Sequence, residues 1–169
     1  MPTARASRRI AAPAEQLWRI VSDPYHLPRW WPRVERVEDV DAGAFTEVMR
    51  TKKGRTVRAD FDLVRADEPA GTVVWEQRLA GTPFAGVLSF SETELRVVPG
   101  AEATDVTIQM RQELSSRPPT TTPDRGLVTG GASDAYWKRH LPSLGGWLLR
   151  RAAQRTIREA LDGLEEISV

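Results

Sequence analysis

The chain has 169 residues, of which 40% are hydrophobic and 28% charged, and this is typical of a single globular domain. Its 24 basic and 23 acidic residues are interspersed and leave a formal net charge of +1, which argues against an extended nucleic-acid-binding face. The absence of cysteine excludes disulfides, thiolate nucleophiles and cysteine-ligated metal sites.

The N-terminal part predicts one strand followed by two short helices. Residues 3–10 are expected to form the strand. In APAEQLWRIVSD, residues 12–23, apolar residues recur at spacings of three and four after an early proline, which predicts a helix. Asp23 and Pro24 end this helix, and a second short helix is expected from Tyr25 to Trp30.

A run of strand-like segments follows. Apolar residues alternate clearly with polar or charged ones in three of them: residues 57–63, 73–79 and 106–114. Three others are less regular: residues 33–40, 44–51 and 88–98. No single face of the last segment is apolar throughout, so its pattern does not fix the direction of Glu92 and Glu94.

The C-terminal part predicts a long loop and then a long helix. Residues 115–143, rich in proline, threonine and glycine, are expected to form the loop. Within it, residues 133–140 are expected to make about two helical turns and to serve as a lid near a cavity mouth. Residues 144–167 predict an amphipathic helix. Its apolar stripe is Leu149, Ala153, Ile157, Ala160, Leu161, Leu164 and Ile167.

These elements predict an α+β fold of the helix-grip type for the whole chain, residues 1–169. About six or seven antiparallel strands with one apolar face need a cover, and only one long helix is available. The economical solution is a curved antiparallel sheet wrapped around the C-terminal helix, with the two short helices placed after the first strand. Since a helix is about 10 Å wide, part of the concave face stays uncovered, and a cavity is expected there.

The opening of the chain resembles a known family. The stretch IAAPAEQLWRIVSDPYHLPRWWPRVERVE, residues 10–38, is similar to the start of the START-like superfamily, also called helix-grip or SRPBCC proteins. The shared features are a strand, a helix with a hydrophobic residue before tryptophan, an aspartate–proline break and a W-x-P second helix. The nearest branch is the polyketide cyclase/dehydrase-like one. The resemblance implies the helix-grip fold, but that fold hosts many functions.

The expected function is binding of a small hydrophobic or aromatic molecule in the cavity between the sheet and the C-terminal helix. The site residues we expect are an apolar wall of Trp31, Trp75, Phe90, Met110 and Ile157, with Gln77 and Gln112 orienting polar groups. Two simpler interpretations stay open. The tryptophans at 30 and 31 could pin the short helices to the sheet, and each glutamine could reach solvent near a strand end.

Two further functions are consistent with the resemblance. One is an enzyme of the polyketide cyclase or dehydratase type, which needs an inward acid or base such as Glu92 or Glu94. The other is a protein-interaction module similar to chaperone activators, with side chains filling the cavity. No catalytic residue is assigned.

Cofactors, metals and membrane insertion are not expected. The two histidines, His26 and His140, have no clustered partners with metal-ligand spacing, and no dinucleotide or Walker fingerprint occurs. Residues 1–13 lack the apolar core of a signal peptide, and no apolar run is long enough to span a membrane. We therefore expect a cytoplasmic protein whose partner is a small molecule, not a nucleic acid.

Overall fold

The computed structural model describes residues 3–51, 53–116 and 134–169, and for residues 134–144 it describes the backbone alone. The strands are β1 (Thr3–Ile10), β2 (Val34–Asp41), β3 (Ala44–Arg50), β4 (Thr56–Asp67), β5 (Thr72–Arg78), β6 (Leu88–Pro99) and β7 (Thr104–Leu114). The helices are α1 (Ala14–Val21), α2 (Leu27–Trp30) and α3 (Asp134–Ser168), with 3-10 turns η1 (Pro24–His26) and η2 (Pro83–Gly86).

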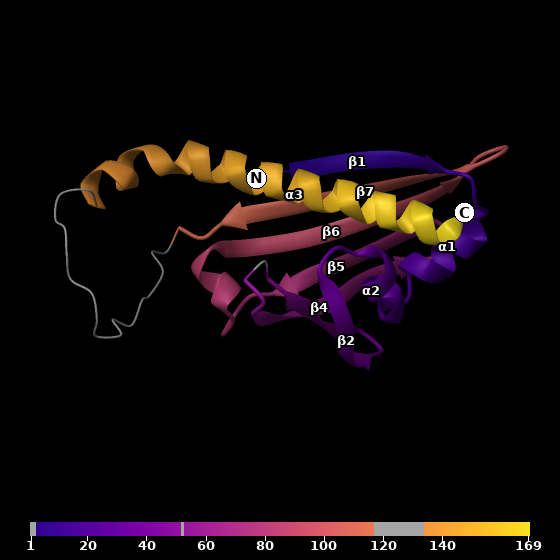
Figure 1. Cartoon of the computed structure of the whole chain (residues 1–169), viewed down its shortest axis with the longest axis horizontal. Coiled ribbons are helices and arrows are strands. Elements are labelled where there is room, and N and C mark those ends of the chain that lie inside the picture. The colour runs from indigo at the N-terminus through magenta and orange to yellow at the C-terminus, as the bar shows by residue number, and fades with distance from the viewer. Residues whose placement is uncertain (1–2, 52, 117–133) are drawn as a thin grey trace.

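The strands form one antiparallel sheet in the order β1-β7-β6-β5-β4-β3-β2 (Figure 1). Strands that follow one another along the chain pair directly, except that β1 pairs with β7. The less regular segment 33–40 supplies the edge strand β2. The α+β helix-grip fold predicted from the pattern is thereby confirmed.

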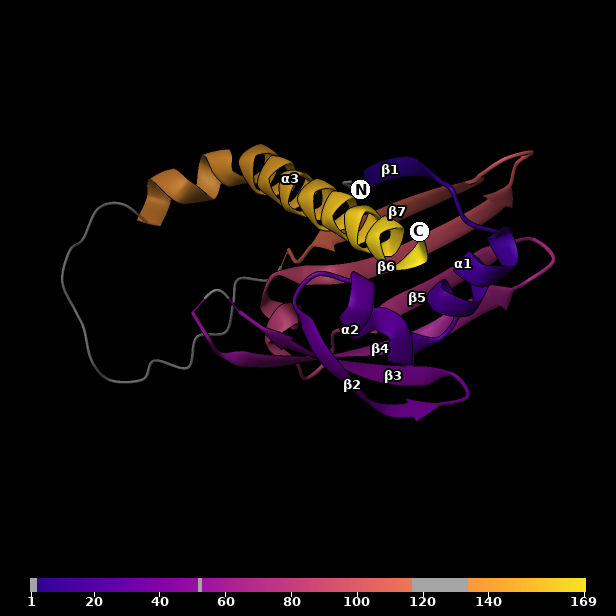
Figure 2. The ribbon, with the colours of Figure 1, turned by 45° about the vertical axis from the view of Figure 1, so that its right-hand side comes forward.

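Helix α3 runs along the curved sheet above β1 and β7, while α1 and α2 close one end (Figures 1 and 2). We call the face of the sheet turned toward α3 the concave face, and the opposite one the outer face. The α3 residues that belong to the core are Ala153, Ile157, Ala160, Leu161 and Leu164. Gly163 allows α3 to approach α2 closely, because a Cβ atom there would lie 2.6 Å from the Trp30 carbonyl oxygen.

Helix α3 begins ten residues earlier than the pattern predicted, at Asp134 instead of 144. Residues 134–140 are thus the first turns of α3 and not a separate short helix. The helix continues through Pro142 and Gly145, residues of low helix propensity, which is why the pattern placed its start after them. The rest of the predicted loop, from 117 to 133, lies outside the described residues. Although α3 has 35 residues, neither it nor another described helix combines the length and apolar character needed to cross a membrane.

Candidate ligand site on the concave face of the sheet

Aromatic side chains from three strands and from the residue that follows α2 meet on the concave face. The ring centroids of Trp31, which follows α2, and Trp75 of β5 are 5.9 Å apart in an edge contact. The ring of Phe45 of β3 makes an edge contact with Trp75, with ring centroids 6.1 Å apart, and stacks on Phe61 of β4, with ring centroids 5.2 Å apart. Each of these four side chains is at most 9% exposed. We call these four residues the aromatic cluster. Trp31 and Trp75 were expected in one wall, and the structure brings them into contact.

Polar side chains of β5, β6 and β7 lie on the same concave face, next to the aromatic cluster. Gln77 lies opposite Phe61, which places it on the side of the aromatic cluster. Ser91 of β6 lies opposite Gln112 of β7, and Gln112 Nε2 donates a hydrogen bond to Ser91 Oγ at 3.4 Å. One step along the sheet, Thr93 lies opposite both Trp75 and Met110. We call Gln77, Ser91, Thr93 and Gln112 the polar strip.

Most of the expected site residues therefore share the concave side, but Phe90 does not. Ile157 of α3 is fully buried in the core that this face shares with the helix. Phe90 lies opposite Glu113, out of phase with the inward Ser91. From Phe90 onward β6 alternates regularly, so Phe90 falls on the face of Glu92; the bulge between Leu88 and Phe90 gives the inward phase of Ser91 to Leu88 instead. The prediction that Phe90 belongs to the wall is wrong.

Glu92 and Glu94, the acids considered for an enzymatic role, lie on the outer face. Glu92 pairs with Arg111 and Glu94 with Arg96, and their side chains are 16% and 17% exposed. Both alternate with the inward Thr93 along β6. Neither carboxylate can therefore act on a molecule bound at the concave face.

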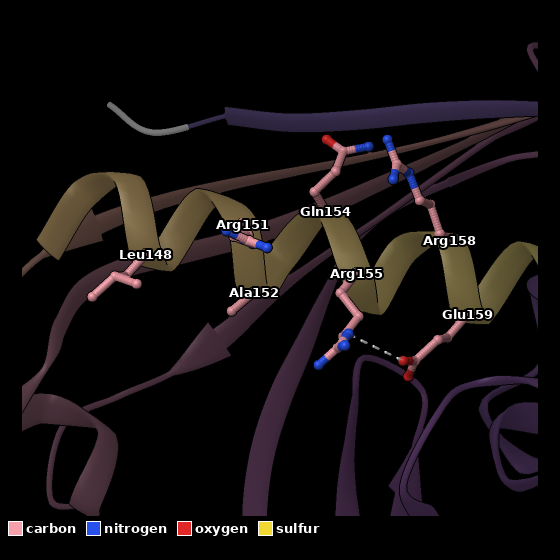
Figure 3. Close-up of a pocket in the computed structure, with 7 residues that line it drawn as sticks. All are labelled: Leu148, Arg151, Ala152, Gln154, Arg155, Arg158 and Glu159. Carbon is pink, nitrogen blue, oxygen red and sulfur yellow. Dashed lines mark ion pairs between the residues drawn. The ribbon is translucent and has the colours of Figure 1, made fainter. Parts of the chain in front are cut away.

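A hollow of about 570 Å³ runs along α3 (Figure 3). The described residues that line it are Leu148, Arg151, Ala152, Gln154, Arg155, Arg158 and Glu159. None of them belongs to the aromatic cluster or the polar strip. Arg155 and Glu159 form an ion pair across one helical turn. The hollow is thus a basic surface feature of the helix, separate from the concave-face residues.

The concave face also carries an acid that the sequence analysis missed, Glu47 of β3. Its neighbours on the adjacent strands are Val37 and Ala59, both of which pack against the core. Glu47 is 2% exposed, and its Oε1 atom has no hydrogen-bond partner within the part of the chain that the structure describes. Burial alone raises the pKa of this carboxyl to about 8. Glu47 is therefore a neutral acid at pH 7.

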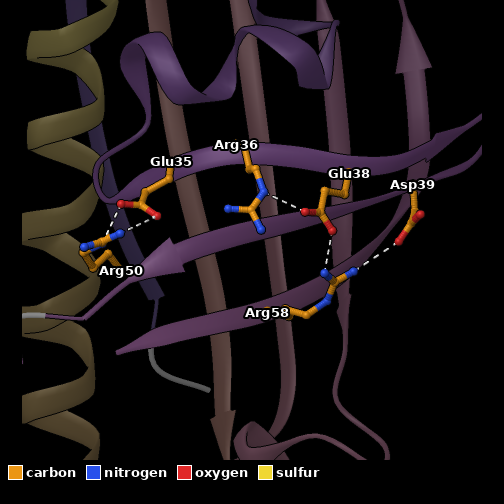
Figure 4. Close-up of polar contacts among 6 residues, drawn as sticks. All are labelled: Glu35, Arg36, Glu38, Asp39, Arg50 and Arg58. Carbon is orange, nitrogen blue, oxygen red and sulfur yellow. Dashed lines mark hydrogen bonds and ion pairs between the residues drawn. The ribbon is translucent and has the colours of Figure 1, made fainter. Parts of the chain in front are cut away.

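The charged residues of the neighbouring strands are engaged elsewhere. Arg58 of β4 pairs with Glu38 of β2, Arg36 pairs with the same Glu38, and Arg50 pairs with Glu35 (Figure 4). The hydrogen bonds from Arg36 and then from Arg58 hold the pKa of the Glu38 carboxyl below its ordinary value. Two carboxyls on adjacent strands thus have opposite environments, since Glu38 is paired in water and Glu47 is buried with no charged group of the described residues acting on it.

A metal site finds no support in the described residues, where no group of three or more His, Asp or Glu side chains is placed to hold an ion.

Comparison with known proteins identifies the family. A family model described as "Polyketide cyclase / dehydrase and lipid transport" matches residues 1–168. The di-domain aromatase/cyclase BexL of the BE-7585A biosynthetic pathway is 18% identical, with a TM-score of 0.70, over 98% of this chain and 46% of BexL. This chain thus spans less than half of BexL. No protein with a curated description matches.

Two other solved structures match this chain over nearly their full lengths. The Zhui aromatase/cyclase from Streptomyces sp. R1128 is 19% identical, with a TM-score of 0.67, over 98% of this chain and 92% of Zhui. A START superfamily protein from Mycobacterium smegmatis is 14% identical, with a TM-score of 0.66, over 98% of this chain and 96% of that protein. At these identities the structural likeness establishes the fold, while the family model covers almost every residue. The chain therefore belongs to the polyketide cyclase/dehydrase and lipid transport family.

Proposed function

We propose that this protein binds a small hydrophobic or aromatic molecule between α3 and the concave face of the sheet. The body of the molecule lies against Trp75 and Met110, and Gln77 and Gln112 orient its polar groups. This proposal extends the family assignment, which supports a role in ligand binding or cyclisation, to particular residues.

The polar strip is the observation that carries the proposal. A face that serves packing alone favours apolar residues, because every inward polar group has to find a partner. The hydrogen bond from Gln112 to Ser91 is long, at 3.4 Å, and Gln77 lies beside an aromatic ring. The amides therefore keep donor and acceptor capacity that a bound molecule can use.

Burial along the face supports access for such a molecule. Val73 and Leu95, near the end closed by α1, are at most 1% exposed. Gln77 and Gln112, further along β5 and β7, are only half-buried, and so is Met110. A molecule that enters from the end opposite α1 therefore reaches the polar strip before it meets the buried core around Val73 and Leu95.

A cyclase or dehydratase reaction is the second candidate, and Glu47 is the observation that favours it. Such chemistry needs an inward acid or base with a shifted pKa, and burial gives Glu47 this property. Zhui and BexL are aromatase/cyclases, which adds support for a ligand that contains or forms rings.

Fluorescence titration with 2-naphthol, a flat apolar probe with one hydroxyl group for the glutamines to orient, tests the proposed site. Replacing Gln112 with leucine is expected to weaken binding about tenfold through the loss of one polar contact. Gln109→Leu is the matched control, because Gln109 belongs to the same strand but lies opposite Arg5 and Glu94 on the outer face. Absence of saturable binding, or the same loss in both variants, would refute the proposal.

Mass spectrometry under native and then denaturing conditions asks what the protein carries from the cell. A mass that is lost on denaturation would identify the ligand class. If no mass is found and the probe also fails to bind, the core is packed solid and the protein-interaction role is favoured.

A further inference from the structure

The carboxyl group of Glu47 is built into the concave face next to the aromatic cluster. Along β3, the residues on its side of the strand are Phe45, which is 1% exposed, and Met49, which is half-buried. Across the sheet, Glu47 lies beside Ala59, whose small side chain adds little bulk in front of the carboxyl. The neighbouring row of residues is Phe45, Phe61 and Gln77. Glu47 and Ala59 therefore form the next inward row after Phe45, Phe61 and Gln77, beside the proposed ligand site.

We propose that Glu47 is a hydrogen-bond donor of this site, and that its ligand carries an oxygen acceptor, a ketone or quinone carbonyl, at the end that reaches β3. This inference rests on the proposed function above. It names the chemical class of the ligand and a residue that selects it.

The unpaired Oε1 atom of Glu47 is the observation that carries this inference. Among the buried residues of the described chain, Glu47 is the one carboxylic acid, and its Oε1 atom has no partner there. A buried polar group without a partner costs about 1–3 kcal/mol, so native proteins keep few of them, and a bound molecule or water is one explanation for each. A neutral carboxyl has one O–H to donate, and a carbonyl oxygen is the complementary acceptor.

Within the described part of the chain, the charged groups of the neighbouring strands are engaged elsewhere and do not compete for this role. On β4, Arg58 pairs with Glu38, and Asp60 accepts a hydrogen bond from Thr46 on the outer face. On β2, Arg36 pairs with the same Glu38. The charged end of β3, Arg50, pairs with Glu35 of β2.

Among the side chains that the structure describes, the helices likewise place no charged partner on the Glu47 carboxyl. On α2, Arg29 contacts His26, and on α3, Arg155 pairs with Glu159. Burial remains the single cause of the raised pKa of Glu47, with no charge–charge contribution from any of these groups.

The experiment compares two probes that differ in one oxygen acceptor, 2-acetylnaphthalene and 2-ethylnaphthalene. Wild-type protein at about pH 6 is expected to bind the acetyl probe about tenfold more tightly than the ethyl probe. At about pH 9.5, where the carboxyl is ionised and can only accept, this preference is expected to disappear.

Two variants assign the effect to Glu47. Glu47→Gln keeps an N–H donor that does not titrate, so the acetyl preference should persist at both pH values. Glu47→Met removes the donor and should bind both probes with the same affinity. Methionine is apolar, and its unbranched side chain is similar in length to that of glutamate, so the variant is expected to fold.

The outcomes separate this inference from the proposed function. Binding of both probes to wild-type protein without an acetyl preference overturns the role of Glu47 alone. An acetyl preference that Glu47→Met retains, or one that is independent of pH in the wild type, overturns it as well. Failure of both probes to bind any of the proteins overturns the ligand site and this inference together.

Discussion

Replacing Glu47 with glutamine is expected to change how the free energy of unfolding depends on pH. Burial raises the pKa of the Glu47 carboxyl from 4.5 to about 8 in the folded protein. The folded chain therefore holds a proton that the unfolded chain releases between these values. Stability from this proton is fully present below pH 4.5 and is lost as the pH rises through about 8. One pKa unit corresponds to about 1.4 kcal/mol, so the full effect is about 5 kcal/mol, of which about 3.5 kcal/mol falls between pH 5 and pH 8.

The assay is urea unfolding of the wild type and Glu47→Gln at several pH values, followed by tryptophan fluorescence. Other titrating groups contribute equally to both proteins, so the difference between the two unfolding free energies isolates position 47. From pH 5 to pH 8, this difference is expected to move by about 3.5 kcal/mol in favour of the glutamine variant. A difference that stays within about 1 kcal/mol across that range would show that Glu47 is not the buried neutral acid inferred here.

Three further predictions concern packing and surface charge, and urea unfolding measures each of them. Trp75→Ala should cost about 3–5 kcal/mol, since the ring is 3% exposed within the aromatic cluster, and a loss below about 1 kcal/mol would contradict its core position. Gly163→Ala should cost about 1–3 kcal/mol, because the new Cβ would lie 2.6 Å from the Trp30 carbonyl oxygen. Gly145→Ala in the same helix meets one side-chain atom at 3.2 Å and should instead gain up to about 1 kcal/mol, and equal effects would refute the contrast. Arg8→Ala, which removes two ion pairs between β1 and α3, should cost about 1 kcal/mol at low salt and less at high salt.

The sequence predicts the fold well where one face of a strand is covered and the other is wet. The sequences of β4, β5 and β7 alternate in this way, and their inward residues follow from it directly, although the first four residues of β5 are buried on both faces. Trp75 and Gln77 are two positions apart on β5, so a period of two places them on the same face. The same reasoning gives Met110 and Gln112 on β7. These four positions owe their predictability to the regularity of their strands.

The remaining positions could not be predicted because local features override the alternation. On β6 a bulge turns Leu88 inward while Phe90 stays in the outward phase of Glu92, so no single face of the segment is apolar, and a bulge is not visible in the hydrophobic pattern. On β3 both faces are covered, since Thr46 and Val48 are as buried as Phe45 and Glu47. A strand that is buried on both sides shows no contrast between inward and outward residues. Glu47 was therefore not singled out, although it shares its phase with Phe45.

Stability and ligand binding are coupled at Glu47, and this coupling is itself measurable. A ligand that accepts a hydrogen bond from the neutral carboxyl binds the protonated protein more tightly, so by linkage it must raise the pKa of Glu47 further. Saturating 2-acetylnaphthalene should therefore shift the pH at which stability is lost to a value above about 8. The ethyl probe, which has no acceptor, should raise stability at every pH without moving that midpoint. Equal midpoints with the two probes would mean that the ligand oxygen and the Glu47 proton do not meet.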